Sequence, residues 1–381
     1  MATPRTPEVD VIRLVALFGI CIVNIPIMGM LYDSVSEPVS PAHDQYASFF
    51  LSLLFDGKFI LLFSFIFGWG IAIQEKRVAA SGGNFTGYYF SRAFGLIFLG
   101  ILHMAFIYGG DILVTYGLMS LVFWFFRGFA LRTQVKRFVL LMLGLNYLTI
   151  ILFTIAVIAL FLMMGWDDTE FLEFSNKDLG GSFYEATLQR LREGSFLLSV
   201  LFVVFLFQGL AAFGLGYAAE YSGFFREKSA GFLKLQQLWP KLLFLGLLCN
   251  FPYALAISEL SENGWVWLGA LLWFIGAPAL SAVYLYFIIT VARQIQIPEL
   301  FLLAGRNSLS VYVLQGLIAS LLFGGYGLGL FDQFGDLALI PVCIGIYLVT
   351  VVFVGWYAQQ FGRGFLEPVL RWISGNPKSG V

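Results

Sequence analysis

The sequence predicts an all-α, polytopic membrane protein: a helical bundle of about ten transmembrane helices with both termini in the cytoplasm. Its hydrophobic fraction is 59% and only 12% of its residues are charged. The mean hydropathy is +0.85. A water-soluble globule of this length could not bury that much apolar surface. Ten apolar stretches are each about long enough to cross a bilayer. Basic residues also gather in alternate connections between these stretches, as the positive-inside rule requires.

This composition also excludes several classes of protein. Disordered chains, secreted disulfide scaffolds and ordinary cytosolic enzymes do not have it. The chain has 22 Lys and Arg against 23 Asp and Glu, so no basic excess points to nucleic acid. Its three cysteines lie in apolar runs, and its two histidines are too few for a His-rich metal cluster. We therefore expect no metal site and no nucleic-acid partner.

The whole chain is expected to form one integral membrane domain, residues 1–381. The spans must be helices, because open strands would leave backbone groups unpaired in lipid and the alternating pattern of a barrel is missing. We place them at residues 11–31, 48–73, 89–108, 112–126, 138–164, 195–220, 239–257, 266–291, 300–323 and 337–357.

Charge then orients these spans. With ten crossings, all basic residues but Lys58, Lys177, Arg190 and Arg192 fall on one side, which is expected to be the cytoplasm. The opposite connections are acidic or neutral. The longest of them, the outer loop 165–194, contains a segment at 183–191 that is expected to form a short interfacial helix.

Ionisable side chains inside spans are costly and usually functional. His103 lies eleven residues after Arg92, which places both on one helix face, about 16 Å apart along the axis. Its imidazole suits a general base or nucleophile, although a packing histidine is an alternative. Asp111 can cap the next helix. Lys58 could pair with Asp56 or Asp111.

Two further groups of polar residues have alternative interpretations. Asn24, in the first span, is either a substrate contact or a hydrogen-bonding link between helices. Arg13, Arg92 and Arg306 lie at cytoplasmic helix ends, as topology anchors or as a phosphate clamp. Arg306 with Asn307 is the strongest phosphate candidate, because the motif is expected at a helix N-terminus, which favours anions. The glycines around Trp69 are expected to allow close helix packing.

Four sets of residues together resemble the bacterial YeiB-like family of multi-span membrane proteins of unknown function. The resemblance lies in residues 10–13 with 22–24, in 58–59 with 62–64 and 67–70, in 100–103 with 110–113, and in 305–315 with 326–329 and 364–367. Leu14 departs from this pattern, since the family usually has glycine there.

The YeiB-like family looks related to a wider superfamily of transmembrane acyltransferases. That kinship implies an acyl group taken from cytoplasmic acyl-CoA and delivered, with a buried histidine, to an acceptor at or beyond the membrane. His103 matches the YeiB-like motif. In the lysosomal heparan acetyltransferase branch the histidine follows the first span, which makes His43 a secondary candidate.

The sequence therefore predicts a membrane acyltransferase that uses acyl-CoA as its co-substrate. His103, oriented by Asp111 or Lys58, would act as the base or carry the acyl group, and Asn24 or Lys58 would stabilise the oxyanion. Arg13, Arg92, Arg306 and Asn307 would hold acyl-CoA. The expected partners are the lipid bilayer and a small-molecule, glycan or lipid acceptor with a hydroxyl or amine. The alternatives are a small-metabolite transporter or exporter and a non-catalytic membrane partner protein.

Overall fold

A computed structural model describes residues 6–32, 40–131, 135–164, 175–258, 260 and 266–375. These residues form thirteen α-helices and a short 3-10 helix, η2 (Lys177–Gly180), which confirms the predicted all-α class. The α-helices are α1 (Pro7–Gly29), α2 (Ala42–Leu54), α3 (Lys58–Ala80), α4 (Phe85–Phe106), α5 (Ile112–Leu131), α6 (Val135–Met164), α7 (Phe183–Ser222), α8 (Ala230–Ile257), α9 (Val266–Gln294), α10 (Glu299–Arg306), α11 (Ser308–Phe323), α12 (Asp336–Phe361) and α13 (Glu367–Ser374).

Within the described residues, eight candidate spans are long and apolar enough to cross a membrane, with α2 and α3 counted together as one span, Ala42–Ala80. All ten predicted spans coincide largely with helices. Two of them are not among the eight: α7, and α11, which is apolar but shorter. Residues 165–174 of the predicted outer loop lie outside the described residues.

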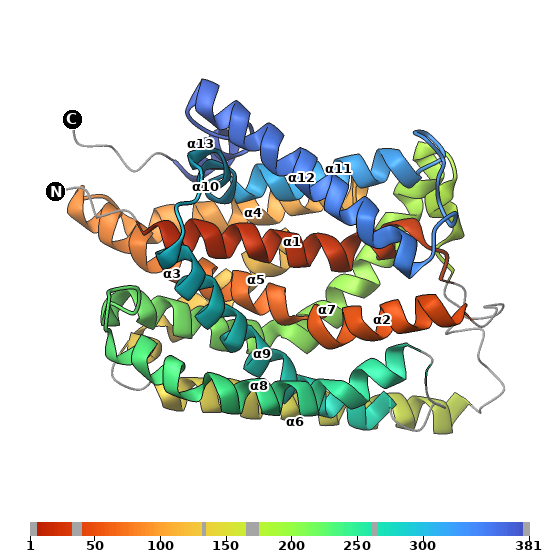
Figure 1. The fold of residues 1–381 in the computed structure, drawn as a ribbon, viewed down its shortest axis with the longest axis horizontal. Coiled ribbons are helices and arrows are strands. Elements are labelled where there is room, and N and C mark those ends of the chain that lie inside the picture. Colours follow the sequence, from red (N-terminus) through yellow and green to blue (C-terminus); the bar gives the residue numbers. More distant parts are fainter. Residues whose placement is uncertain are drawn as a thin grey trace.

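The long helices run alongside one another, and α1 lies near the middle of the bundle (Figure 1). α1 packs against α3, α9, α10, α11 and α12, and α3 in turn packs against α7. The main apolar core joins α1, α3 and α11 through side chains such as Ile12, Ile66 and Val311. α1 begins at the end of the bundle where α13 lies (Figure 1).

Some boundaries differ from the sequence prediction. The span predicted at 48–73 consists of two helices, because Gly57 adopts a left-handed backbone (φ +76°) that ends α2 and starts α3. The span at 300–323 is likewise divided into α10 and α11.

The separate interfacial helix expected at 183–191 is wrong, because that segment is the first part of α7. Ser182 and Glu185 form a capping box that starts this helix well before residue 194. The helix then continues without a break to Ser222.

Candidate functional site

His103 and Asp111 form a buried pair between α4 and the start of α5. His103 Nδ1 lies 2.8 Å from Asp111 Oδ2, and both side chains are almost fully buried. Although these two atoms are close, Nδ1 has no hydrogen-bond partner among the described residues. Among the described residues, His103 Nε2 has no hydrogen-bond partner. Asp111 Oδ1 accepts from the backbone N–H of Val114 (2.8 Å), which confirms that Asp111 caps α5.

Two glycines allow the neighbouring helices to approach this pair. A Cβ at Gly100 would lie 2.6 Å from Asp111 Oδ1, so only glycine lets α4 come this close to the start of α5. A Cβ at Gly316, on α11, would lie 2.9 Å from His103 Nε2. The free imidazole nitrogen therefore faces the backbone of α11.

Tyr312 is a member of this site that the sequence analysis did not single out. Its hydroxyl lies 3.5 Å from Asp111 Oδ2 and accepts weakly from the backbone N–H of Ile112. Its ring centroid is 5.0 Å from that of His103. The signal in the sequence is its spacing on α11, since Tyr312 and Gly316 are one helical turn apart. Tyr312 and His103 thus both contact Asp111 Oδ2.

The structure does not bring Lys58, Asn24 or His43 into contact with the His103–Asp111 pair; each has other surroundings. Lys58 is fully buried and donates from Nζ to the backbone oxygen of Ser52 (2.6 Å). Asn24 lines a large cavity. His43 is 64% exposed at the start of α2, with Nε2 3.5 Å from Asp44 Oδ2. Asp111, rather than Lys58, is therefore the residue that contacts His103.

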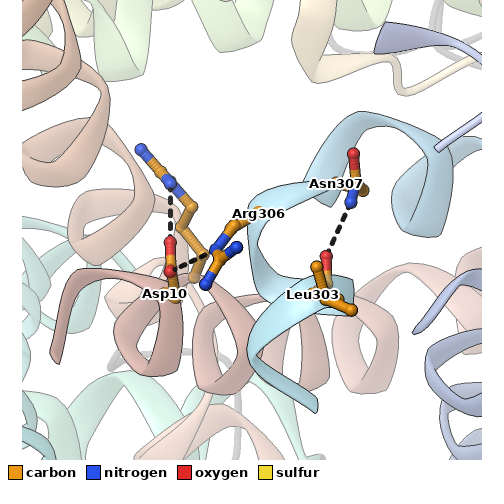
Figure 2. A network of polar contacts seen from close by, with 5 residues as sticks. Asp10, Leu303, Arg306 and Asn307 are labelled. Carbon is orange, nitrogen blue, oxygen red and sulfur yellow. Dashed lines mark hydrogen bonds and ion pairs between the residues drawn. The ribbon is translucent and has the colours of Figure 1, made fainter. Parts of the chain in front are cut away.

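At the end of the bundle where α1 begins, Asp10 joins two of the predicted arginines. Its carboxylate lies 3.2 Å from Arg13 Nη1 and 2.9 Å from Arg306 Nε. Figure 2 shows Asp10 reached by Arg306, which comes from the last turn of α10. Arg306 Nη2 is buried without a hydrogen-bond partner among the described residues. Arg92 lies over the ring of Phe67 (5.9 Å to the centroid).

The N-terminus of α11 is met by a carboxylate of the chain itself. Glu367 accepts from the backbone N–H of Ser310 (3.1 Å) and from its hydroxyl (2.5 Å). Asn307 donates to the backbone oxygen of Leu303 (2.8 Å; Figure 2) and accepts from the backbone N–H of Gly364 (2.8 Å). Arg306 thus ends α10 rather than starting α11. The motifs around residues 305–310 and 364–367 are linked by hydrogen bonds.

Six arginines, which we call the arginine cluster, lie around this end of the bundle: Arg13, Arg77, Arg92, Arg306, Arg363 and Arg371. Burial, followed by the nearby charges of Arg363, Arg77 and Arg92, lowers the pKa of Arg371. Several arginines this close together produce a concentrated positive field, and such a field attracts anions.

A cavity of about 1080 Å³ lies beside the start of α5. Gly110 and Ile112, which flank Asp111 in the chain, line this cavity, as do Asn24, Asp56 and Tyr116. His103 is not among its lining residues. The described structure therefore places the imidazole next to the cavity wall but not in it.

A long-helix bundle with a buried His–Asp pair, a large cavity and a cationic end defines a class of polytopic membrane protein with an internal site. Residues 219–375 match the model of a family described as "Protein of unknown function (DUF418)". The predicted resemblance to YeiB-like proteins is confirmed.

The relatives extend over nearly the whole chain. The uncharacterized protein YxaH of Bacillus subtilis is 26% identical, covering 96% of this chain and 93% of the relative. The uncharacterized protein YeiB of Escherichia coli is 26% identical, covering 97% and 96%. No solved structure matches the chain.

Proposed function

We propose that this protein is a membrane-embedded acyltransferase that moves an acyl group from acyl-CoA to a hydroxyl or amine acceptor. The observation that carries the proposal is the buried His103–Asp111 pair with a free Nε2. An unpartnered imidazole nitrogen in a buried site is costly unless a substrate group completes it. The arginine cluster supports the proposal, because it could hold the phosphates of acyl-CoA about 16 Å from His103 along α4.

In this mechanism His103 Nε2 removes the proton of the acceptor as its oxygen or nitrogen attacks the thioester carbon. The carbon–sulfur bond then breaks, and coenzyme A leaves as the thiol after the proton returns to sulfur. Asp111 stabilises the imidazolium that forms, and Tyr312 is a positioning residue for Asp111. Because Gly316 lies over Nε2, the acceptor reaches it only when α11 moves away from α4.

The proposal includes ten crossings of a bacterial inner membrane, with both termini cytoplasmic. Two observations support this orientation. α1 begins at the end of the bundle where α13 lies (Figure 1), and the arginine cluster lies at the same end. Acyl-CoA would then bind from the cytoplasm, and the acceptor would be taken from the bilayer or its outer side.

The first prediction tests this function with the purified full chain. We expect wild-type protein, given acetyl-CoA or palmitoyl-CoA and a bacterial lipid extract, to release coenzyme A thiol. His103→Ala should lower this rate by about 100-fold or more, since a positioned general base contributes that much. His43→Ala is the matched control, because that imidazole is exposed, and it should leave the rate unchanged. Equal rates for His103→Ala and wild type, or no thiol release by wild type, contradict the proposal.

A second candidate function is the transport of a small metabolite. It is favoured by one observation: the large cavity is lined by Asn24 and Asp56 but not by His103. Protein reconstituted in liposomes separates the two functions, since transport needs no acyl donor and leaves the solute unmodified.

A further inference from the structure

The cavity of about 1080 Å³ is at the upper end of the size of small-molecule sites. Its lining comes from eight of the long helices and from α2, and most of it is aliphatic or aromatic. α1 contributes Ile20 to Ile27, α5 contributes Thr115 to Met119, and α9 contributes Ala270 to Phe274. A space of this size and character suits a molecule with a long hydrocarbon part.

The rim of the cavity is apolar and reaches the surface of the bundle. Ile27, Ile151, Ile155, Ile257 and Leu271 all line the cavity, and each is more than a third exposed. They belong to candidate membrane spans, so the surface on which they lie is the one that lipid would cover. An occupant can therefore enter sideways from the bilayer without crossing water.

The polar part of the wall is a carboxylate at the break between α2 and α3. The hydroxyl of Tyr253 lies 3.5 Å from Asp56 Oδ2, and Trp273 Nε1 donates to the backbone oxygen of Asp56 (3.1 Å). Lys58 does not line the cavity; its ammonium group donates to the backbone oxygen of Ser52 and also interacts electrostatically with Asp56. These contacts hold Asp56 in the wall of the cavity.

A second polar group points to a ligand independently. Thr115 is 4% exposed and lines the cavity, and its hydroxyl has no hydrogen-bond partner among the described residues. A buried hydroxyl without a partner costs free energy that a ligand can recover.

The charge of the wall decides which head group fits. Asp56 and Asp336 line the cavity, while none of its described lining residues is Lys, Arg or His. An anionic head group, a carboxylate or a phosphate, would be repelled there and left without a cationic partner. A neutral hydroxyl or a protonated amine can donate a hydrogen bond to Asp56.

We propose that this cavity binds an amphiphile from the bilayer that has a long hydrocarbon chain and a hydroxyl or amine head group. The head group donates to Asp56, and Thr115 supplies a second hydrogen-bonding group in the wall. That this amphiphile is also the acyl acceptor rests on the function proposed above, since both need a hydroxyl or an amine. Binding itself needs no acyl donor.

The test uses three photoreactive C16 probes of equal length: a diazirine-bearing alcohol, the matching amine and the matching carboxylic acid. Each is crosslinked to the purified full chain without acyl-CoA, and the labelled peptides are mapped. We expect the alcohol and amine to label cavity-lining helices about tenfold more than the acid, a difference of about 1.4 kcal/mol. Ala270→Phe places a bulky ring in the cavity and should lower this labelling severalfold.

Two substitutions test the polar contacts. Asp56→Asn should raise acid labelling relative to alcohol labelling, a ratio that a merely structural effect would leave unchanged. Thr115→Val should weaken alcohol labelling severalfold, whereas Thr149→Val should not, because Thr149 bonds to its own helix at Leu145 and does not line the cavity. The melting temperature of each variant shows whether it folds. If Asp56→Asn does not fold, Thr115→Val and Ala270→Phe still test the proposal.

Equal labelling by the three probes, undiminished labelling in Ala270→Phe, or an unchanged acid-to-alcohol ratio in a folded Asp56→Asn each overturns the proposal. Labelling of the cavity together with no thiol release from acyl-CoA would overturn the acyltransferase function alone. No labelling of the cavity in the wild-type protein, together with thiol release from acyl-CoA, would overturn the cavity proposal alone.

Discussion

Arg190 is a buried cation that ties three elements together near the start of α7. Its guanidinium donates to the backbone oxygen of Phe106 (3.0 Å) and to the hydroxyl of Ser320 (3.1 Å), and it also reaches the hydroxyl of Tyr326. It therefore links the end of α4, the end of α11 and the turn that follows α11. The sequence analysis left Arg190 unexplained because its partners are distant in the chain.

We predict that Arg190→Met destabilises the protein by roughly 2–3 kcal/mol, because charged hydrogen bonds are lost and their acceptors stay buried. The melting temperature in detergent measures this. Arg226→Met, at an exposed position, should change it little. A similar melting temperature for both variants would show that Arg190 is not a structural link.

At this same scale, the sequence predicted part of the candidate site. The spacing of Arg92 and His103, and the cap at Asp111, follow from local helix geometry. The contact of Asp111 with Tyr312 could not be predicted, because it joins residues 201 positions apart. Lys58 was predicted to pair with an acid, but which groups surround it depends on the break at Gly57.

The crossing of α3 and α7 depends on glycine at the contact. A Cβ at Gly216 would lie 1.7 Å from the backbone oxygen of Phe65, and one at Gly68 would lie 2.0 Å from that of Phe213. The close helix packing expected for the glycines around Trp69 is thus confirmed at Gly68 but not at Gly70. Gly70, on the same helix, has no heavy atom within 4 Å of the added Cβ.

We predict that Gly216→Ala destabilises the protein by about 3 kcal/mol, because backbone cannot yield as a flexible side chain does. Gly70→Ala is the matched control and should lie within about 1 kcal/mol of wild type, since alanine favours helix. Both are measured by denaturant or thermal unfolding in the same detergent. Equal stability of the two variants would contradict the packing at this crossing.

Glu367 couples α13 to the start of α11, and its titration should be visible in stability. Burial raises the pKa of Glu367, although hydrogen bonds from Ser310 oppose the shift. A carboxyl whose pKa is raised on folding stabilises the fold at low pH, and this contribution is lost as the pH rises through the folded pKa. We predict that wild type gains stability relative to Glu367→Gln as the pH falls from 7 towards about 4.3, the unfolded value.

Glu185 provides a control of opposite sign for this pH dependence. The hydroxyl and backbone N–H of Ser182 lower the pKa of Glu185, which is exposed. Its contribution is present above the unfolded pKa and is lost as the pH falls through the folded one. Wild type should therefore lose stability relative to Glu185→Gln on acidification. Parallel pH profiles for wild type and Glu367→Gln would contradict the coupling.

For the whole molecule, hydropathy predicted where helices lie because each span must satisfy its own backbone in lipid. It did not predict how they pack. The large cavity is formed by residues that range along the chain from α1 to α12 and meet only in three dimensions, and no local pattern marks Asp56 and Thr115 as members of one wall. The sequence showed the motifs at 305–310 and 364–367 separately, but it did not predict the hydrogen bonds between them.

The orientation in the membrane leads to the last prediction. If ten spans place both termini in the cytoplasm, the connection after α3 is cytoplasmic and the connection before α12 is on the outer side. Ser81 and Gln333 are exposed in these two connections, and the native cysteines Cys21, Cys249 and Cys343 are buried. In intact bacterial cells, an impermeant maleimide should label Gln333→Cys, whereas Ser81→Cys should react only after permeabilisation. Reaction of both from outside would mean an even number of spans between them, and the reverse pattern would place the arginine cluster outside, away from cytoplasmic acyl-CoA.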